Sequence, residues 1–206
     1  PVASPTTTTI YTVTATDGQG CATTATTQVF VKPLPVPSIT SSNTLCLGSS
    51  LTFTGSGANT YTWTTGGSGG LSATTGSIVS ATPSATGNIT YTATVTGTNN
   101  CVTSAIKTIT VNPIPTANAS VSNTLTCTNT TISLTGTGGG TYAWSGPGIT
   151  SGSTTATPSV NAPGNYSLVV TSAAGCPSSM TSVAVTQNTT SPVVTSASSA
   201  VLNCTL

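Results

Sequence analysis

The segment Tyr91-Thr92-Ala93-Thr94-Val95-Thr96 alternates an apolar residue with a threonine at every step. The segment Tyr11-Thr12-Val13-Thr14-Ala15-Thr16 has the same pattern. A period of two is typical of a β-strand that buries one face and exposes the other, and the β-branch of threonine favours the pleated surface of a strand. Because no stretch sustains a period of 3.6, the sequence predicts an all-β protein.

Several landmarks of the sequence recur at a step of 75 to 81 residues. The segment Thr60-Tyr61-Thr62-Trp63-Thr64 returns as Thr141-Tyr142-Ala143-Trp144-Ser145, and Val31-Lys32-Pro33-Leu34-Pro35 returns as Val111-Asn112-Pro113-Ile114-Pro115. In three copies a tyrosine is followed ten residues later by a cysteine: Tyr11 and Cys21, Tyr91 and Cys101, and Tyr166 and Cys176. A fixed step of this size indicates an array of small domains.

The proline-rich segments mark the boundaries between the copies. We expect residues 36–114 and 116–192 to be two complete repeats of about seven strands each. Residues 1–34 would be the C-terminal strands of a truncated repeat, and residues 193–206 the first strands of another, so we expect a longer parent protein. Short proline-rich junctions fix φ and extend the chain. The sequence therefore predicts a linear rod of domains.

Ionisable residues are almost absent from the sequence. About 39% of the 206 residues are Thr or Ser, only Asp17, Lys32 and Lys107 are charged, and there is no Glu, Arg or His. One carboxylate cannot supply an acid–base pair or a calcium site built on several carboxylates, and two lysines make no basic patch for nucleic acid. We therefore predict a protein that is not an enzyme and has no metal, cofactor or nucleic-acid partner. No run approaches 18 apolar residues, so we expect no membrane insertion.

The six cysteines predict disulfides in an oxidising, extracellular compartment. The frame of repeats leaves two pairs within complete repeats and two cysteines that would pair outside this chain: Cys46–Cys101, Cys127–Cys176, Cys21 and Cys204. Closing a loop of about 50 residues stabilises a fold by roughly 4 kcal/mol in the chain-entropy model, so we expect reduction to unfold the repeats. Two alternatives stay open: free thiols in a cytosolic protein, and a domain-swapped polymer in which Cys204 of one copy bonds Cys21 of the next.

A few aromatic residues dominate the expected core. Each complete repeat has one tryptophan, Trp63 or Trp144, where we expect the indole to pack against the disulfide between two sheets. Tyr11, Tyr91 and Tyr166 are in phase with the apolar positions of their strands. We place these five side chains in the core. The alternative is an exposed aromatic platform that binds sugars.

The order of a cysteine, a tryptophan, a strand-opening tyrosine and a Gly-rich turn with a second cysteine resembles bacterial immunoglobulin-like and PKD-like repeats. With its Val-Asn-Pro-Ile-Pro linker and Thr-Tyr-Thr-Trp strand, the chain is especially similar to tandem repeats in large secreted or cell-surface proteins of Bacteroidota, which include adhesins and gliding-motility-associated proteins. The resemblance implies tandem Ig-like β-sandwich domains. Two features depart from it: the turn Thr64-Thr65-Gly66-Gly67 is not acidic, and each tyrosine lies ten residues before the second cysteine instead of two.

The hydroxyl-rich surface allows several interpretations. Thr-x-Thr runs are similar to ice-binding faces, but twisted sandwich strands favour ordinary outward-facing threonines. An isopeptide bond from Lys32 or Lys107 to an asparagine would lack the carboxylate that such chemistry needs. Glycosylation sequons occur at Asn88, Asn118, Asn129, Asn165, Asn188 and Asn203. A surface with so little charge lacks mutual repulsion, so we expect either covalent glycans or lateral association.

These observations favour a structural role. We predict a spacer or fibre-forming repeat of a large extracellular adhesin or surface filament, whose partners are copies of itself or neighbouring repeats. The alternative function is that of carbohydrate-binding accessory modules in a secreted protein that acts on polysaccharides.

Overall fold

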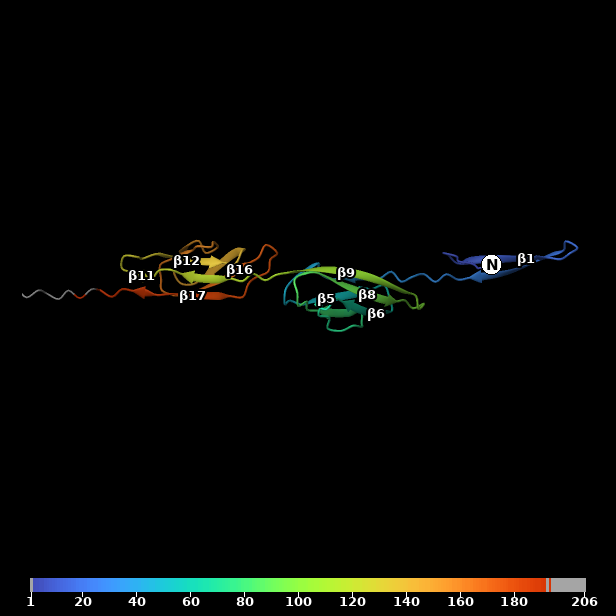
Figure 1. Ribbon diagram of the computed structural model, residues 1–206, viewed down its shortest axis with the longest axis horizontal. Coiled ribbons are helices and arrows are strands. Elements are labelled where there is room, and N and C mark those ends of the chain that lie inside the picture. The colour runs from blue at the N-terminus through green and yellow to red at the C-terminus, as the bar shows by residue number, and fades with distance from the viewer. Residues whose placement is uncertain (1, 192, 194–206) are drawn as a thin grey trace, which may run out of the picture. The chain divides into compact units, whose positions relative to one another are not determined.

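The computed structural model describes residues 2–191 and 193, and these residues form strands, turns and loops without a helix (Figure 1). The chain divides into two compact units, Pro1–Pro113 and Ile114–Leu206. No helix long and apolar enough to cross a membrane occurs in this described part. The expected strands after residue 193, including Cys204, lie outside it. The prediction of an all-β protein is confirmed.

The first unit opens with an antiparallel hairpin of β1 (Thr9–Thr16) and β2 (Ala22–Val29). Tyr11 lies opposite Thr27 in this hairpin, as Tyr91 lies opposite Lys107 in the hairpin of β8 (Gly87–Thr96) and β9 (Val102–Asn112). The two registers coincide after a shift of 80 residues along both strands. Within residues 2–191, no third strand joins β1 and β2. The hairpin is therefore a copy of β8–β9 whose inward face lacks the opposing sheet.

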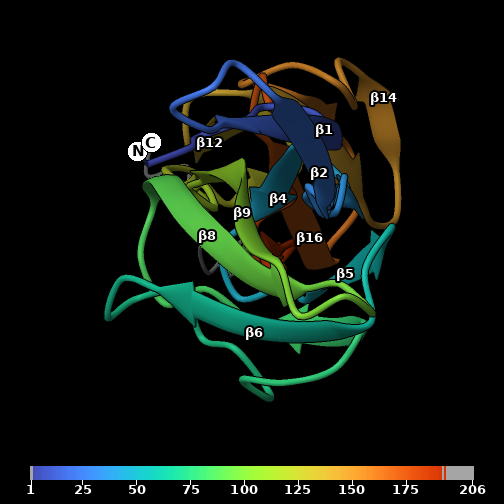
Figure 2. The same cartoon turned by 90° about the vertical axis from the view of Figure 1, so that its right-hand side faces the viewer.

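The first module, as we call strands β3 to β9, is a sandwich of two sheets. Its other strands are β3 (Ser38–Thr40), β4 (Thr44–Cys46), β5 (Leu51–Ser56), β6 (Thr60–Thr65) and β7 (Ile78–Ala81). One sheet has the order β3-β5-β7 and the other β4-β9-β8-β6. Figure 2 shows β8 between β6 and β9. Only β4 and β9 pair in parallel, and every other neighbouring pair of the module is antiparallel.

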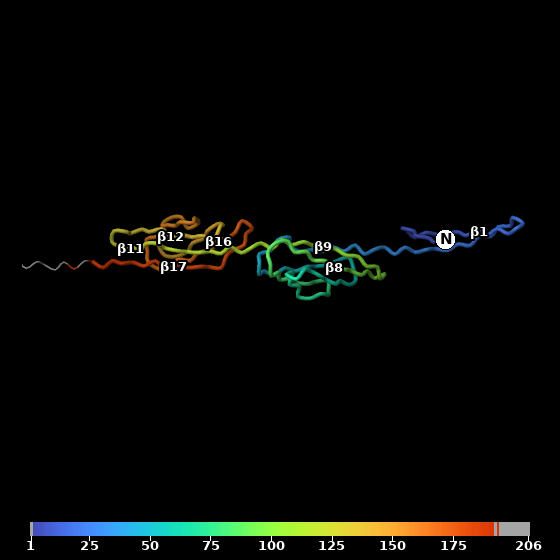
Figure 3. The backbone as a smooth tube through the Cα atoms, viewed as in Figure 1, coloured from blue at the N-terminus to red at the C-terminus, as the bar shows by residue number. Residues whose placement is uncertain are grey.

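The second module, strands β10 to β18, repeats this arrangement in shorter pieces. Its strands are β10 (Asn118–Val121), β11 (Leu125–Thr126), β12 (Ile132–Thr137), β13 (Thr141–Ser145), β14 (Ile149–Ser151), β15 (Ser159–Val160), β16 (Gly164–Thr171), β17 (Thr181–Val185) and β18 (Gln187–Asn188). The sheets have the orders β10-β12-β15-β14 and β13-β16-β17, and β11 pairs in parallel with β18. The trace in Figure 3 follows the backbone from β1 to β17. Strands β13, β16 and β17 thus correspond to β6, β8 and β9.

The alternation read from the sequence sets which side chains enter each core. In β8, Ile89, Tyr91, Ala93 and Val95 are buried, whereas the threonines between them face outward and are exposed or half-buried. The ring of Phe53 on β5 lies 5.3 Å from that of Trp63 and 4.5 Å from that of Tyr91, measured between centroids. Aromatic pairs at these separations stabilise beyond the area that they bury. Each module therefore has a core of its own between its two sheets.

Candidate functional site

Three hairpin turns share one backbone conformation, and each ends in a cysteine: Asp17–Cys21, Gly97–Cys101 and Ser172–Cys176. In each turn the N–H of the first residue donates to the carbonyl oxygen of the cysteine, at 3.0, 2.9 and 2.9 Å respectively. The residue before the cysteine has a left-handed backbone: φ is 85° at Gly20, 64° at Asn100 and 81° at Gly175. Glycine and asparagine tolerate this region better than other residues. The three cysteines therefore occupy equivalent positions in their hairpins.

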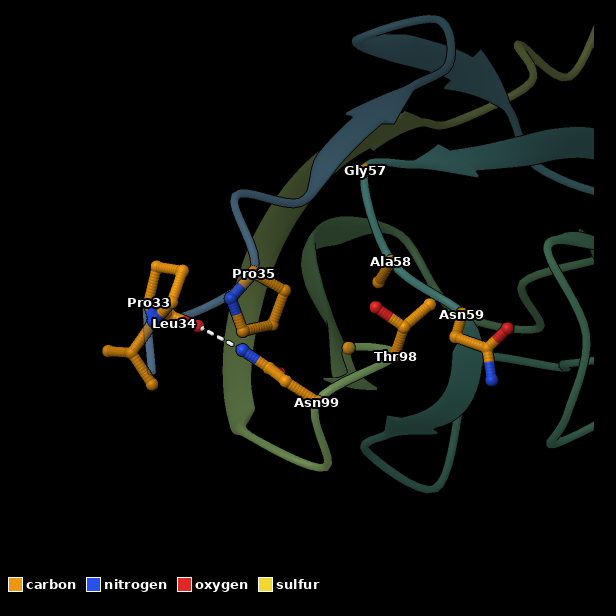
Figure 4. Close-up of a pocket in the computed structure, with 9 residues that line it drawn as sticks. Pro33, Leu34, Pro35, Gly57, Ala58, Asn59, Thr98 and Asn99 are labelled. Atoms are coloured by element: carbon orange, nitrogen blue, oxygen red, sulfur yellow. Dashed lines mark hydrogen bonds between the residues drawn. The ribbon is translucent and has the colours of Figure 1, made fainter. Parts of the chain in front are cut away.

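The turn that carries Cys101 is fastened to the linker that enters the first module. The side-chain amide of Asn99 donates to the carbonyl oxygen of Pro33 at 2.7 Å (Figure 4). In the opposite direction, the ammonium group of Lys32 donates to the carbonyl oxygen of Asn99 at 3.4 Å. The sulfur of Cys101 lies 3.9 Å from the carbonyl oxygen of Lys32. Cys101 is therefore placed at the end of the module where the chain enters.

A pocket of about 460 Å³ lies between this linker and the loops of the first module (Figure 4). Its lining consists of three short segments, 33–35, 57–59 and 97–99. None of these residues has a titratable side chain, and the polar groups available are amides, one hydroxyl and the backbone. Such a lining can accept and donate hydrogen bonds, but it offers no general acid or base.

Cys46 lies at the opposite end of the first module from Cys101. Cys46 pairs with Asn112, the last residue of β9, and the N–H of Leu47 donates to the Asn112 carbonyl oxygen at 2.9 Å. Cys101 directly precedes Val102, the first residue of β9. An 11-residue strand that rises about 3.3 Å per residue extends over more than about 30 Å. A disulfide requires Cα atoms only about 4.4–6.8 Å apart.

Cys127 and Cys176 are separated in the same manner in the second module. Cys127 directly follows Thr126, which pairs with Asn188 at the end of β18. Cys176 lies in the turn before β17, which begins at Thr181. The strand segment from Thr181 to Asn188 therefore separates the two cysteines, and at about 3.3 Å per residue it extends over more than about 20 Å.

The predicted pairs Cys46–Cys101 and Cys127–Cys176 are wrong. Cys101 and Cys127 carry free thiols, whereas Cys46 and Cys176 are each disulfide-bonded. The reason is the length of the strand between the two cysteines of one repeat. The prediction assigned one pair to each repeat without considering this length. Cys21 is also a free thiol.

Both tryptophans lie in the cores and fasten loops. The indole N–H of Trp63 donates to the carbonyl oxygen of Gly76 at 2.9 Å, and that of Trp144 donates to Thr155 at 3.0 Å. Gly76 lies in the loop between β6 and β7, which crosses from one sheet to the other, whereas Thr155 lies in the loop between β14 and β15, two neighbours in one sheet. Since neither module contains a disulfide of its own, the expected packing of an indole against such a bond is also wrong, and Trp63 packs on Phe53 instead.

The tyrosines of β8 and β16 also hydrogen-bond to loops that connect the strands. The hydroxyl of Tyr91 donates to the Gly69 carbonyl oxygen at 2.6 Å, and the hydroxyl of Tyr166 lies at hydrogen-bond distance from the carbonyl oxygens of Pro147 and Ala162. Burial raises the pKa of Tyr91. Burial also raises the pKa of Tyr166, although the hydrogen bond with Ala162 opposes this rise. Tyr11, the equivalent residue of β1, is half-buried.

Each of the three charged side chains makes hydrogen bonds within the first unit. The carboxylate of Asp17 accepts from the N–H groups of Gln19 and Cys21, at 3.0 and 2.8 Å, and so shapes the β1–β2 turn. The ammonium group of Lys107 donates to the side-chain oxygen of Asn43 at 2.6 Å. Asp17 is the only carboxylate side chain of the sequence, so none is available beside this Lys–Asn pair. Residues 2–191 contain no group of three or more His, Cys, Asp or Glu side chains that could hold a metal ion.

No protein-family profile matches the chain, and no curated protein matches it. Among solved structures, the chain is similar to the C-terminal 282-residue fragment of intimin, determined in complex with the intimin-binding domain of the translocated intimin receptor. The TM-score is 0.50 at 18% identity, and the match covers 73% of this chain and 64%, under two thirds, of that fragment. The chain has an immunoglobulin-like fold.

Two further solved structures resemble the immunoglobulin-like chain at lower scores. The fibronectin(III)-like modules of Clostridium thermocellum CbhA match with a TM-score of 0.38 at 13% identity, over 75% of this chain and 95% of that chain. A Ca2+-stabilized adhesin with which an Antarctic bacterium binds ice matches with a TM-score of 0.37 at 15% identity, over 89% and 57%.

Proposed function

We propose that this immunoglobulin-like chain is a non-catalytic structural array that serves as a spacer or fibre-forming part of a large extracellular adhesin or surface filament. The observation that carries the proposal is the attachment of the entering linker to the first module. The Asn99 side-chain amide donates to the carbonyl oxygen of Pro33 in the linker, and the ammonium group of Lys32, also in the linker, donates to the carbonyl oxygen of Asn99. The two prolines, Pro33 and Pro35, restrict φ in the same segment. A junction restrained in this way suits a spacer that projects or transmits force.

The chemistry of the surface supports a structural role. The charged groups of Asp17, Lys32 and Lys107 all make hydrogen bonds to turns or loops of the first unit. The pocket beside Pro33 has no titratable lining. A protein whose surface carries polar but uncharged groups can pack against similar surfaces without charge repulsion.

The outward face of β6, β8 and β9 is the surface that we assign to lateral association. Thr62 pairs with Thr94, which pairs with Ser104, so hydroxyl groups from three strands form one row. A second row contains Thr64, Thr92 and Ile106. Neighbouring strands place such side chains about 5 Å apart. Copies of the chain, neighbouring repeats or covalent glycans are the partners proposed for this face.

The proposed location is extracellular or on the cell surface. Disulfide-bonded Cys46 and Cys176 support an oxidising compartment, and so does the similarity in fold to intimin. The resemblance of the linker and tryptophan motifs extends the proposal to surface adhesins and gliding-motility-associated proteins of Bacteroidota. The carbohydrate-binding alternative has less support, because both tryptophans of the sequence are buried. Only 1% of Trp63 and 6% of Trp144 is exposed.

Small-angle X-ray scattering on the chain tests the proposal. A single compact globule of 206 residues would have a radius of gyration of about 17 Å, and we expect roughly twice this value with the cross-section of one domain. The variant Asn99→Ala, which removes the amide on Pro33, should broaden the distance distribution. A compact or freely jointed particle would contradict the spacer role. Specific binding on a glycan array would support the carbohydrate-binding alternative instead.

A further inference from the structure

We propose that the β1–β2 hairpin is an acceptor surface for the tryptophan-bearing half of another immunoglobulin-like repeat. In the first module this half is residues 36–86, which contain the strands β3 to β7. We call such a segment a donor half. In both modules the donor half precedes its own hairpin along the chain, so the partner of β1–β2 is a donor half on the N-terminal side of the hairpin. The acceptor surface would exist whether or not the chain is a spacer.

The inward face of the hairpin is the side that faces the core in the equivalent strands β8 and β9. Its main apolar members are Tyr11, Val13, Ala15, Ala25 and Val29. Val13 is 63% exposed, whereas Ala93, the residue 80 positions later in β8, is fully buried. A two-stranded hairpin alone is at best marginally stable in water. A partner that covers this face would therefore stabilise the hairpin.

The free edge of β1 is the second part of the acceptor surface. In the first module the equivalent edge of β8 pairs antiparallel with β6, and Trp63 lies opposite Ala93. In the second module, taken by itself, β16 pairs antiparallel with β13, and Trp144 lies opposite Leu168. Within residues 2–191, β1 pairs only with β2. Its unpaired N–H and C=O groups are a template for a further strand, and both modules show a tryptophan-bearing strand at this position.

The first module also shows what lies over the inward face. The ring of Phe53, on β5, has its centroid 4.5 Å from that of Tyr91, the equivalent of Tyr11. The Tyr91 hydroxyl donates to the carbonyl oxygen of Gly69, between β6 and β7. Phe53 and Gly69 both belong to the donor half. A further donor half would therefore give Tyr11 an aromatic neighbour and an acceptor for its hydroxyl.

Residues 2–4 continue the acceptor surface ahead of β1. They line a hollow of about 560 Å³ together with residues of β1 and β2. The residues 80 positions later include Thr82 and Ser84, whose N–H groups donate to the carbonyl oxygens of Gly70 and Ser68, at 2.9 and 3.0 Å. These two carbonyls belong to the loop between β6 and β7 of the donor half. A further donor half would offer the same two acceptors to residues 2 and 4.

The inward face selects an uncharged partner. Thr27 lies opposite Tyr11, at the position where β9 has Lys107 opposite Tyr91. Lys107 donates to the side-chain oxygen of Asn43 in its own donor half, whereas Thr27 has no ammonium group that requires such an acceptor. The partner of β1–β2 is therefore held by burial of aromatic and aliphatic side chains and by strand pairing, without a charged contact.

A chain extended at its N-terminus tests the proposal. A copy of residues 36–81 is fused ahead of Val2, the residue equivalent to Thr82, so that the spacing of the first module is kept. Hydrogen–deuterium exchange then compares the amides of β1 in the original and the extended chain. We expect exchange at least about 100-fold slower in the extended chain, because β1 becomes part of a cooperative core instead of an open hairpin.

Two lysine substitutions in the extended chain distinguish the faces of β1. Val13→Lys places a charge on the inward face and should abolish the added protection, whereas Thr12→Lys, on the outward face, should retain it. Exchange in β8 and β9, followed in the same experiment, verifies that the first module is folded in each variant. Equal exchange of β1 in the original and the extended chain, or protection that survives Val13→Lys, would overturn the proposal. Slow exchange in the original chain that strengthens with protein concentration would also overturn it, since a second copy would then cover the face.

Discussion

The phenolic oxygen of Tyr91 lies 2.6 Å from the carbonyl oxygen of Gly69, in the loop that crosses between the sheets of the first module. Trp63 holds the same loop through the Gly76 carbonyl oxygen. In the second module the Trp144 indole donates to Thr155, between β14 and β15, and the Tyr166 hydroxyl contacts Pro147, between β13 and β14, and Ala162, between β15 and β16. The backbone of the crossing loop of the first module also pairs with neighbouring strands, through bridges of Thr75 with Thr62 and of Leu71 with Ala81, so the two side chains add to backbone pairing. Aromatic residues therefore contribute both core volume and loop anchorage.

The Tyr91 hydroxyl should make the first module sensitive to alkali. Burial raises the pKa of Tyr91, so the folded state keeps the proton while an unfolded tyrosine loses it near pH 10. The stabilisation is complete below about pH 10 and declines above it, by up to about 1.4 kcal/mol per pH unit. Urea unfolding of Trp144→Phe, followed by Trp63 fluorescence at pH 8 and pH 11, measures this decline.

Tyr91→Phe isolates the contribution of that hydroxyl. We expect a loss of about 1–2 kcal/mol at pH 8, because the Gly69 carbonyl oxygen loses its buried donor, and a smaller decline towards pH 11. Tyr11→Phe, in the β1–β2 hairpin, is the matched control and should change neither quantity. An equal alkaline decline in Tyr91→Phe and the parent would show that Tyr91 does not cause it.

The two phenylalanines of the sequence should differ sharply in their contribution to stability. Phe53 is fully buried between Trp63 and Tyr91, whereas 72% of Phe30 is exposed. Phe53→Ala should lower the free energy of unfolding by about 3–5 kcal/mol, since it removes core contacts and leaves a cavity. Phe30→Ala should change it by less than about 0.5 kcal/mol. Similar values for both variants in urea titrations would contradict the assigned core.

Gly55 on β5 is required for close packing, because a side chain there would collide with Tyr61. A Cβ atom at Gly55 would lie 2.5 Å from the Tyr61 ring. Gly55→Ala should therefore destabilise the module by about 1–3 kcal/mol through overpacking. Gly66 has open space around it, so Gly66→Ala is the control and should be close to neutral. The thermal midpoint of each variant distinguishes these outcomes, and a neutral Gly55→Ala would refute the predicted clash.

The left-handed residue of the β8–β9 turn should tolerate only a few replacements. Asn100 has φ of 64°, and Gly20 and Gly175 occupy the equivalent positions. Asn100→Gly should leave stability nearly unchanged, whereas Asn100→Val should cost about 1–2 kcal/mol. Chemical denaturation measures both. Equal stability of the glycine and valine variants would mean that the turn adopts another conformation in solution.

Reduction should leave both modules folded, contrary to what disulfides within repeats would imply. Neither Cys46 nor Cys176 can be bonded inside its own module, so the two cores form without a covalent link. We expect tryptophan emission and far-ultraviolet circular dichroism to remain native-like after treatment with a phosphine reductant. Loss of both signals on reduction would indicate that the cores need the disulfide, as the sequence alone suggested.

Much of the strand architecture can be predicted from single segments. In Leu51-Thr52-Phe53-Thr54-Gly55 and in β8, the alternation of apolar residues and threonine matches the observed alternation of burial, because the period of a strand depends on local backbone geometry. The positions of the cysteines in the three hairpin turns are also determined locally, since Gly20, Asn100 and Gly175 favour the left-handed conformation that precedes each cysteine. Contacts between residues far apart in the sequence cannot be predicted from single segments. Nothing in the sequence near Tyr91 identifies Gly69 as its partner.

The sequence by itself determined the strand content, the repeat and the poverty of ionisable groups, because these properties depend on residue type and spacing alone. Only the tertiary structure decided the cysteine chemistry. Cys46 and Cys101 belong to one repeat, but the full length of β9 separates them, and a disulfide bridges only a few ångströms. Distance through space depends on how strands pair, and the parallel pairing of β4 with the far end of β9 is a long-range choice that spacing along the chain does not encode.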